Sequence, residues 1–204
     1  MYARVASFEN RDMSLVDQLI GDVRERASSG RELPDAKGFL MLIDRQVGTS
    51  LGISFFETEE AIAEAEPAFE RMGDEIPEEI RGRRTSVDVY EVALQEGGEG
   101  AKAARLSSFE GPADRLDEGI RYAEENVLPQ AQELSGWKGI VSLVDRSSGR
   151  SKVITFWESE EAMRASEAQG DRLRAQAAEG GGERITGVER YEVAIYEVEA
   201  PITV

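Results

Sequence analysis

Two nearly identical stretches, FFETEEA at residues 55–61 and FWESEEA at residues 156–162, decide the fold of this chain. They lie 101 positions apart, and the same offset aligns the rest of the two halves without a gap. Three further pairs of stretches match at this offset: ARVASFE (3–9) with ARLSSFE (104–110), KGFLMLIDRQVG (37–48) with KGIVSLVDRSSG (138–149), and TSVDVYEVAL (85–94) with TGVERYEVAI (186–195). One register held over a whole domain indicates an internal duplication.

The duplication predicts the domain organisation. The first repeat is expected at 1–95 and the second at 103–204. The segment between them, 96–102, is rich in Gly and polar residues, as a linker should be.

Each repeat has the pattern β-α-β-β-α-β. In the first repeat, strands are expected at 3–9, 38–44, 49–57 and 87–94, and a first helix at 14–27 has an apolar stripe one turn apart at Leu15, Leu19, Val23 and Ala27. The second helix should begin after Thr58, and its counterpart after Ser159, because each hydroxyl can cap a helix that opens with two glutamates.

This element order predicts an α+β fold made of two ferredoxin-like βαββαβ repeats. The third strand is apolar on both faces, with Phe55 and Phe56 pointing opposite ways. A single repeat would leave one sheet face in water, so the two antiparallel sheets are expected to pack into a pseudo-dimeric α/β barrel. The chain should then be a monomeric pseudo-dimer, or a homodimer through another surface.

Composition excludes several classes of function. The net charge of −17 disfavours nucleic acid as a partner. No run of about 18 apolar residues or signal peptide is present, so we expect no membrane span and a cytoplasmic protein. Cysteine and histidine are both absent, so no thiolate or imidazole can bind a metal or haem, and we expect no metal and no cofactor.

The stretch FWESEEAMRA, with an aromatic pair followed by E-[ST]-E-E-A, resembles the third strand and second helix of antibiotic biosynthesis monooxygenase-like domains. These domains belong to the dimeric α/β-barrel superfamily, and the resemblance covers nearly the whole chain twice. It implies the same fold and a small hydrophobic or aromatic molecule as the partner.

The resemblance leaves three functions open. One branch of the superfamily degrades haem with an Asn, a Trp and a His; Asn10 matches the first, but its repeat has Phe56 in place of Trp, and neither repeat has the His. A second branch oxygenates phenols or quinols without a cofactor, which suits this composition. The third possibility is a non-catalytic ligand-binding or structural barrel, so whether the chain is an enzyme stays open.

The candidate pocket residues follow from the resemblance and the repeat, and none is assigned a catalytic step. Trp157 matches the family motif, although it could simply fill the core as Phe56 does. Arg4 and Arg105 occupy equivalent strand positions and could steady an oxyanion, or each could pair with a nearby Glu. The remaining candidates are Phe56, which holds the position of Trp157 in the first repeat, Tyr90 and Tyr191, which could hydrogen-bond a ligand oxygen, Tyr122, which replaces Gly21 on the first helix, and Asn10.

Overall fold

The computed structural model describes residues 1–9, 12–29, 33 and 35–198. The chain divides into two compact units, which are described separately. Unit 1 comprises residues 1–90 and 193–199, and unit 2 comprises residues 91–192 and 200–204.

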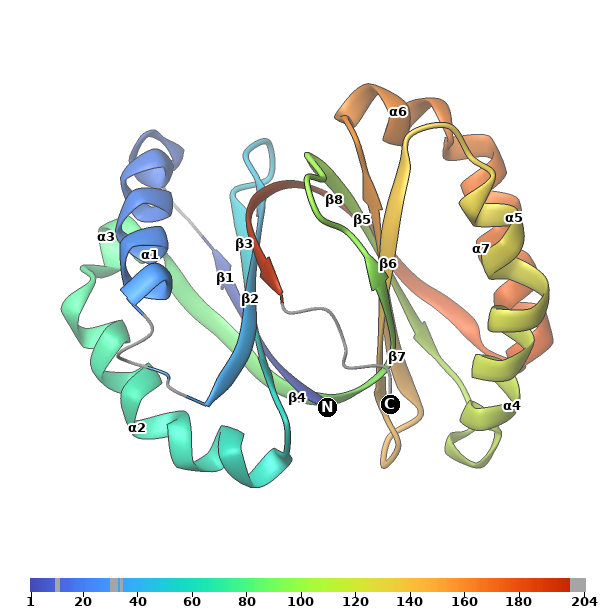
Figure 1. Cartoon of the computed structure of the whole chain (residues 1–204), viewed down its shortest axis with the longest axis horizontal. Helices are drawn as coiled ribbons and strands as arrows, with labels where there is room; N and C mark the ends of the chain where they lie inside the picture. Colours follow the sequence, from blue (N-terminus) through green and yellow to red (C-terminus); the bar gives the residue numbers. More distant parts are fainter. Residues whose placement is uncertain (10–11, 30–32, 34, 199–204) are drawn as a thin grey trace. The chain divides into compact units, whose positions relative to one another are not determined.

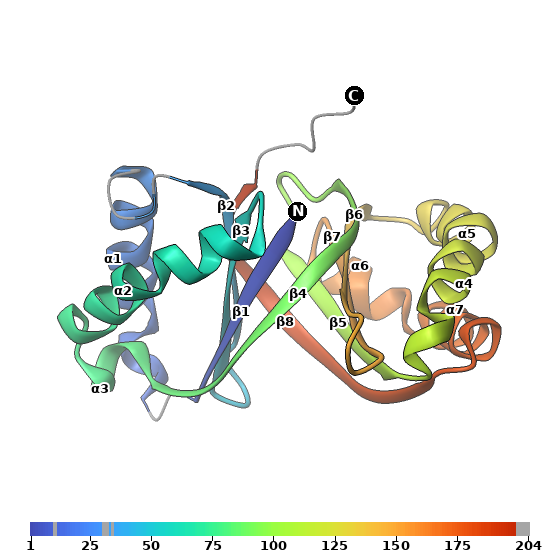
Figure 2. The ribbon, with the colours of Figure 1, turned by 90° about the horizontal axis from the view of Figure 1, so that it is seen from below.

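Unit 1 has the predicted element order. Its elements are β1 (Tyr2–Glu9), a 3₁₀ turn (Met13–Leu15), α1 (Val16–Ser29), β2 (Ala36–Asp44), β3 (Thr49–Phe56), α2 (Glu59–Glu75), α3 (Glu78–Arg81) and the first part of β4 (Arg83–Gly97). The helices α1, α2 and α3 lie on one side of strands β1 to β3 (Figures 1 and 2).

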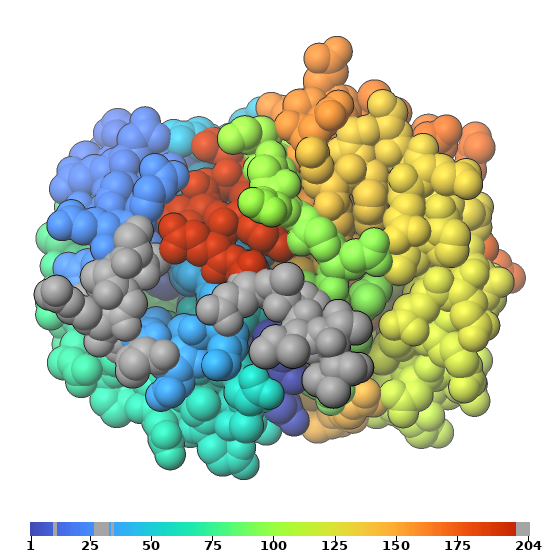
Figure 3. Space-filling view, viewed as in Figure 1, coloured from blue at the N-terminus to red at the C-terminus, as the bar shows by residue number. Residues whose placement is uncertain are grey.

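Unit 2 repeats this order. Its elements are β5 (Ala103–Glu110), a 3₁₀ turn (Ala113–Arg115), α4 (Leu116–Tyr122), a π-helical turn (Ala123–Val127), α5 (Leu128–Gln132), β6 (Trp137–Asp145), β7 (Arg150–Trp157), α6 (Glu160–Ala165), α7 (Glu167–Gly181) and the first part of β8 (Arg184–Val198). The segment through α4 and α5 forms a continuous stretch of the surface of this unit (Figure 3).

The eight strands hydrogen-bond in the closed order β1-β3-β2-β8-β5-β7-β6-β4. Within unit 1, β3 pairs antiparallel with β1 and β2; within unit 2, β7 pairs antiparallel with β5 and β6. The structure therefore confirms the predicted α+β class, with ferredoxin-like units and a closed eight-stranded barrel.

The last strand of each repeat belongs to both units. The first part of β8 pairs with β5 in unit 2, and residues 193–198 belong to unit 1. Conversely, Glu91–Gly97 of β4 pair with β6 in unit 2. The compact units thus change over inside two long strands, and 96–97, the start of the expected linker, lies in β4. The assignment of 96–102 as the boundary between the repeats stays a prediction.

The predicted local signals are present. Thr58 Oγ1 accepts a hydrogen bond from Ala61 N at 3.2 Å, and Ser159 Oγ accepts one from Ala162 N at 3.1 Å, so both second helices are capped as expected. Gly48 ends the hairpin turn with φ of 81°, which a residue with a side chain rarely adopts.

The apolar stripe of α1 is rotated slightly from the prediction. Val16, Leu19 and Ile20 are buried, whereas Leu15 is only half-buried. The three buried residues form the core between α1 and the sheet of unit 1, together with Met41, Ile43, Ile76 and Ile195. Ile195 comes from the end of β8, so the last strand of the chain completes this core.

The first helix of unit 2 is interrupted where that of unit 1 is continuous. In its π-helical turn, Leu128 N–H bonds to Ala123 O instead of the carbonyl four residues back. Pro129 follows directly and has no N–H to donate, so the regular α-helical pattern cannot continue through it.

Candidate functional site

Trp157 and Arg105 lie on the same face of neighbouring strands in unit 2. The register pairs Ala103 with Trp157 and Arg105 with Thr155, so the two candidate side chains are adjacent on one face of the sheet. The Arg105 guanidinium carbon lies 5.3 Å from the centre of the Trp157 ring, which is within the range of a cation–π contact. Trp157 Nε1 donates to Thr155 Oγ1 at 3.1 Å, so its polar group is satisfied locally.

The Trp157 indole is enclosed by apolar groups. It packs with Ala103 and Met163, and its ring meets that of Trp137 edge-on, with centres 5.8 Å apart. Trp157 is only 1% exposed, whereas Trp137, which packs against it, is half-buried. The packing in this cluster is therefore that of a core edge.

Arg105 is buried and forms an ion pair. Its Nη2 donates to Ser166 Oγ at 3.0 Å, to Glu167 Oε2 at 3.1 Å and to the Met163 carbonyl. Burial lowers the pKa of Arg105, and the Glu167 charge partly opposes that shift. Because an arginine side chain stays protonated in proteins, the group is a cation at neutral pH.

Glu167 accepts hydrogen bonds from three guanidinium groups. Besides Arg105, it accepts hydrogen bonds from Arg174 Nη2 at 3.2 Å and from Arg190 Nη2 at 2.7 Å. Partial burial raises the pKa of Glu167, but the Arg190 hydrogen bond and the three nearby cations outweigh it, so the net pKa is lowered. Glu167 is therefore a fixed anion and a poor proton acceptor at neutral pH.

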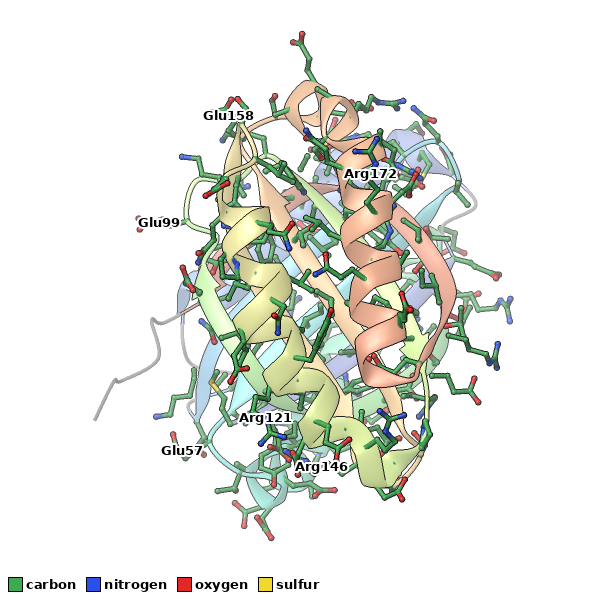
Figure 4. The ribbon with its side chains drawn as sticks, turned by 90° about the vertical axis from the view of Figure 1, so that its right-hand side faces the viewer. Glu57, Glu99, Arg121, Arg146, Glu158 and Arg172 are labelled. Carbon is green, nitrogen blue, oxygen red and sulfur yellow. The ribbon has the colours of Figure 1, made fainter. Side chains whose placement is uncertain are left out.

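Helix α7 carries both the Glu167 carboxylate and the Arg174 guanidinium. It begins at Glu167, carries Arg174 two turns later, and lies beside α4 and α5 (Figure 4). Gly170 of this helix lies directly against Arg105, since a Cβ there would be 2.6 Å from Arg105 Nη1. Any side chain at position 170 would displace the guanidinium.

Unit 1 holds an equivalent but closed arrangement. Arg4 donates from Nε and Nη2 to the two carboxylate oxygens of Glu66, at 2.9 and 2.8 Å. The Phe69 ring covers the Arg4 guanidinium at 4.0 Å, and it meets the buried Phe56 ring edge-on. The sequence alternative of an ion pair with a nearby Glu is thus the arrangement found for both Arg4 and Arg105.

Tyr191 is not on the same sheet face as Trp157 and Arg105. The register pairs Arg190 with Arg105 and Tyr191 with Ala104. Side chains alternate along a strand, so Tyr191 faces the opposite side of the sheet from the Arg105 and Arg190 groups that share Glu167. Tyr90, its counterpart in unit 1, is likewise buried.

Tyr122 stands apart from this cluster. The Tyr122 ring lies against Gly180 of α7, where a Cβ would be 2.2 Å from the ring, so it packs α4 onto α7. Asn10 lies outside the described residues. Of the candidates from sequence, the structure therefore brings together Trp157 and Arg105 in unit 2, and Phe56 and Arg4 around Phe69 in unit 1.

Sequence reasoning did not identify the partners of the two arginines. Glu66 and Glu167 are 101 positions apart, like Arg4 and Arg105, so both members of the ion pair match at the same offset. That shared offset was a usable signal. Arg174 and Arg190 have Gly73 and Val89 at the corresponding positions, so only the structure reveals their approach to Glu167.

Within residues 1–9, 12–29, 33 and 35–198, no three acidic side chains converge in a way that would hold a metal ion. Among the helices of those residues, none is long and apolar enough to cross a membrane. An open depression on α6 is lined by Glu160, Glu161, Arg164 and Ala165.

Sequence comparison gives the relatives of this chain. No family model matches it. The uncharacterised protein Rv2557 of Mycobacterium tuberculosis is 30% identical over 207 residues, covering 98% of this chain and 91% of that protein. The chain belongs to the same family.

Solved structures share the fold of this family member. A provisionally named monooxygenase of Fusobacterium nucleatum superposes with a TM-score of 0.66 at 15% identity, covering 97% of this chain and 94% of that one. An anthrone oxidase-like protein gives a TM-score of 0.62 at 13% identity, with coverage of 97% and 91%. The fold is that of the dimeric α/β-barrel proteins of the antibiotic biosynthesis monooxygenase type, as the sequence predicted.

Proposed function

We propose that this protein is a cofactor-independent oxygenase of phenolic or quinol small molecules, with its site in unit 2. The proposal is carried by the contact between Trp157 and Arg105, which places an aromatic surface beside a buried cation. The names of the structural neighbours, monooxygenase and anthrone oxidase-like, supply the reaction class.

The chemistry requires little from the protein. A phenol that has lost its proton is electron-rich enough to react with O₂, and the product quinone keeps one oxygen atom while the other leaves as water. The protein would hold the phenolate, stabilise its oxyanion and exclude bulk water. Arg105 offers the positive charge that would stabilise the oxyanion, and the apolar groups around Trp157 would exclude bulk water.

Oxygen uptake tests the proposal directly. Protein treated with chelators would be offered a panel of polycyclic phenols and quinols, with Trp157→Phe and Trp137→Phe alongside. We expect uptake that survives chelation, falls at least about ten-fold in Trp157→Phe, and falls less in Trp137→Phe. Equal uptake by wild type and Trp157→Phe would remove the site from unit 2.

The alternative is a binding or structural barrel without catalysis. The burial of Trp157 favours it, because a ring that is 1% exposed in a packed cluster needs no ligand. In Trp137→Phe protein, acrylamide quenching reports on Trp157 alone. Quenching that phenols protect against supports a ligand site, whereas an indole equally inaccessible with and without phenols supports core packing.

A further inference from the structure

Glu183 lies at the junction between helix α7 and strand β8 in unit 2. Gly182 ends α7 with φ of 67°, and Glu183 N–H bonds back to the Ala178 carbonyl at 2.8 Å. This is the Schellman arrangement, in which the residue after the left-handed glycine frequently makes an apolar contact with the last turn of the helix. The Glu183 carboxyl group therefore occupies a position that suits an uncharged side chain.

The Glu183 side chain is packed against three parts of unit 2. Ser151 at the start of β7 is 6% exposed, and its hydroxyl donates to Glu183 Oε1 at 3.3 Å. A Cβ on Gly111, which follows β5, would be 2.7 Å from Glu183 Cγ, and one on Gly181 would be 3.1 Å from Oε2. Glycine at both positions makes room for the carboxyl group. The α7–β8 turn, residues 180–184, is therefore held against β5 and β7 through this side chain.

No cation among the described residues forms an ion pair with Glu183. The charged groups on the elements around it are Arg115 and Glu118, which pair with each other, likewise Arg150 with Asp145 and Arg184 with Glu110, and the exposed carboxylates of Asp114 and Glu179. The negative end of the α7 dipole also lies at the carboxyl group. These surroundings favour the protonated form of Glu183 over the carboxylate.

The acidity of Glu183 agrees with this packing. Burial raises its pKa, and the Ser151 hydrogen bond opposes that shift only in part. A group whose pKa is raised by folding stabilises the folded state at low pH, and this contribution is lost as pH rises through the folded value. The first repeat has no such group, since Gly82 is at the corresponding position.

We propose that Glu183 is a pH-dependent latch of the α7–β8 turn. While its carboxyl group is protonated, it stays between Ser151 and Gly111 and holds the turn in place. When the proton is released to solvent, the carboxylate moves out into water and the turn opens locally, because a partly buried charge without a cation is costly. The latch goes beyond the oxygenase proposed above and uses none of the residues around Trp157.

Amide hydrogen exchange of the full chain tests the latch. The reporters are the N–H groups of Gly182 and Glu183, which bond to the Glu179 and Ala178 carbonyls at the end of α7. We expect their protection, corrected for the intrinsic exchange rate, to fall at least about five-fold between about pH 4.5 and pH 8. In Glu183→Gln, whose side chain is uncharged throughout, protection should stay at the level found in acid. Equal pH profiles for the two proteins would overturn the proposal.

Two controls separate the latch from general effects of pH. Glu179→Gln removes an exposed carboxylate in the last turn of α7 and should keep the wild-type profile. Gly82 N–H, in the corresponding turn of unit 1, bonds to the Glu78 carbonyl at 2.8 Å, and its protection should change less than about two-fold. A fall at Gly82 as large as that at Gly182 would indicate general unfolding and contradict a local latch.

A second measurement needs no variant. The carboxyl carbon of Glu183, followed by NMR in the folded protein, should titrate above the pH of about 4.3 that is ordinary for an unfolded chain. The protection of Gly182 N–H should fall over the same pH range. Titration of Glu183 at or below the ordinary value would overturn the latch.

Discussion

At the scale of single residues, the equivalent arginines Arg4 and Arg105 are paired with carboxylates in two different ways. A strand arginine that faces the helices must be paired, since an isolated buried charge is costly. Arg4 is paired by two parallel hydrogen bonds and covered by an aromatic ring, whereas Arg105 shares its carboxylate with two other arginines. The Arg4 pair uses two donors of its guanidinium, whereas Nε of Arg105 has no acceptor among the described residues.

Replacing Glu66 by Gln tests the closed pair. It leaves the Arg4 charge 4% exposed without its anion, and we expect a loss of about 1–3 kcal/mol in the free energy of unfolding, because Glu66 itself is partly exposed. Denaturant titration measures this loss. Glu64→Gln, at an exposed position beyond the first turn of the same helix, is the control and should be near neutral.

The Arg4–Glu66 pair should make the free energy of unfolding depend on pH in the acidic range. The Arg4 hydrogen bond holds the pKa of Glu66 below its ordinary value, so its contribution is fully present above the unfolded pKa of about 4.3 and is lost as pH falls through the lower folded value. Glu66→Gln should flatten this part of the stability profile between about pH 5 and pH 2. An identical acid slope in both proteins would contradict the assignment.

Glu183 should make stability depend on pH in the opposite direction from Glu66. Burial raises its pKa, which the Ser151 hydrogen bond only partly opposes, so the folded protein holds this proton more tightly than the unfolded chain. Stability should therefore fall as pH rises from about 4.3 through the raised folded value. Glu183→Gln should be more stable than wild type at pH 7 by thermal denaturation, and a lower melting temperature would contradict this.

At the scale of elements, helix packing in unit 2 depends on a missing side chain. Tyr122 fills a space on α4 that Gly21 leaves empty on α1, and the ring is accommodated because α7 has Gly180 opposite it. The sequence showed the exchange of Gly21 for Tyr122 but not its partner, because Gly180 is distant in the chain and sits in a Gly-rich stretch.

Substituting these glycines separates packing from helix propensity. Gly180→Ala places a Cβ 2.2 Å from the Tyr122 ring and should cost about 1–3 kcal/mol through overpacking. Gly21→Ala meets nothing within 4 Å and should stabilise by up to about 1 kcal/mol, since Ala is the better helix former. Denaturant midpoints that shift in the same direction for both variants would contradict this account.

At the scale of the whole molecule, the two compact units depend on exchanged strand ends. Residues 91–97 pair with β6 in unit 2, so a chain cut at the repeat boundary loses them. A chain of residues 103–204 would expose an unpaired edge of β6, and exposed edges aggregate. A chain of residues 91–192 keeps that pairing.

We therefore expect the 91–192 chain to be more soluble and more cooperatively folded than the 103–204 chain, judged by sedimentation and thermal unfolding. The full chain should be monomeric, or dimeric through another surface, by light scattering. Higher solubility and a sharper transition for 103–204 would show that the repeat, not the compact unit, is the folding unit.

The sequence by itself predicted the α+β class, the two capped helices and the match of Arg4 with Arg105 at a 101-residue offset, because these depend on periodicity and on one fixed offset. Only the tertiary structure decided which groups meet. It placed Tyr191 on the opposite sheet face from Arg105, made Glu167 the shared partner of three arginines, and gave Arg105 Nε no acceptor within the described part of the chain. Such contacts join residues tens of positions apart on strands and helices, and their pairing is set by sheet register and helix packing rather than by local pattern.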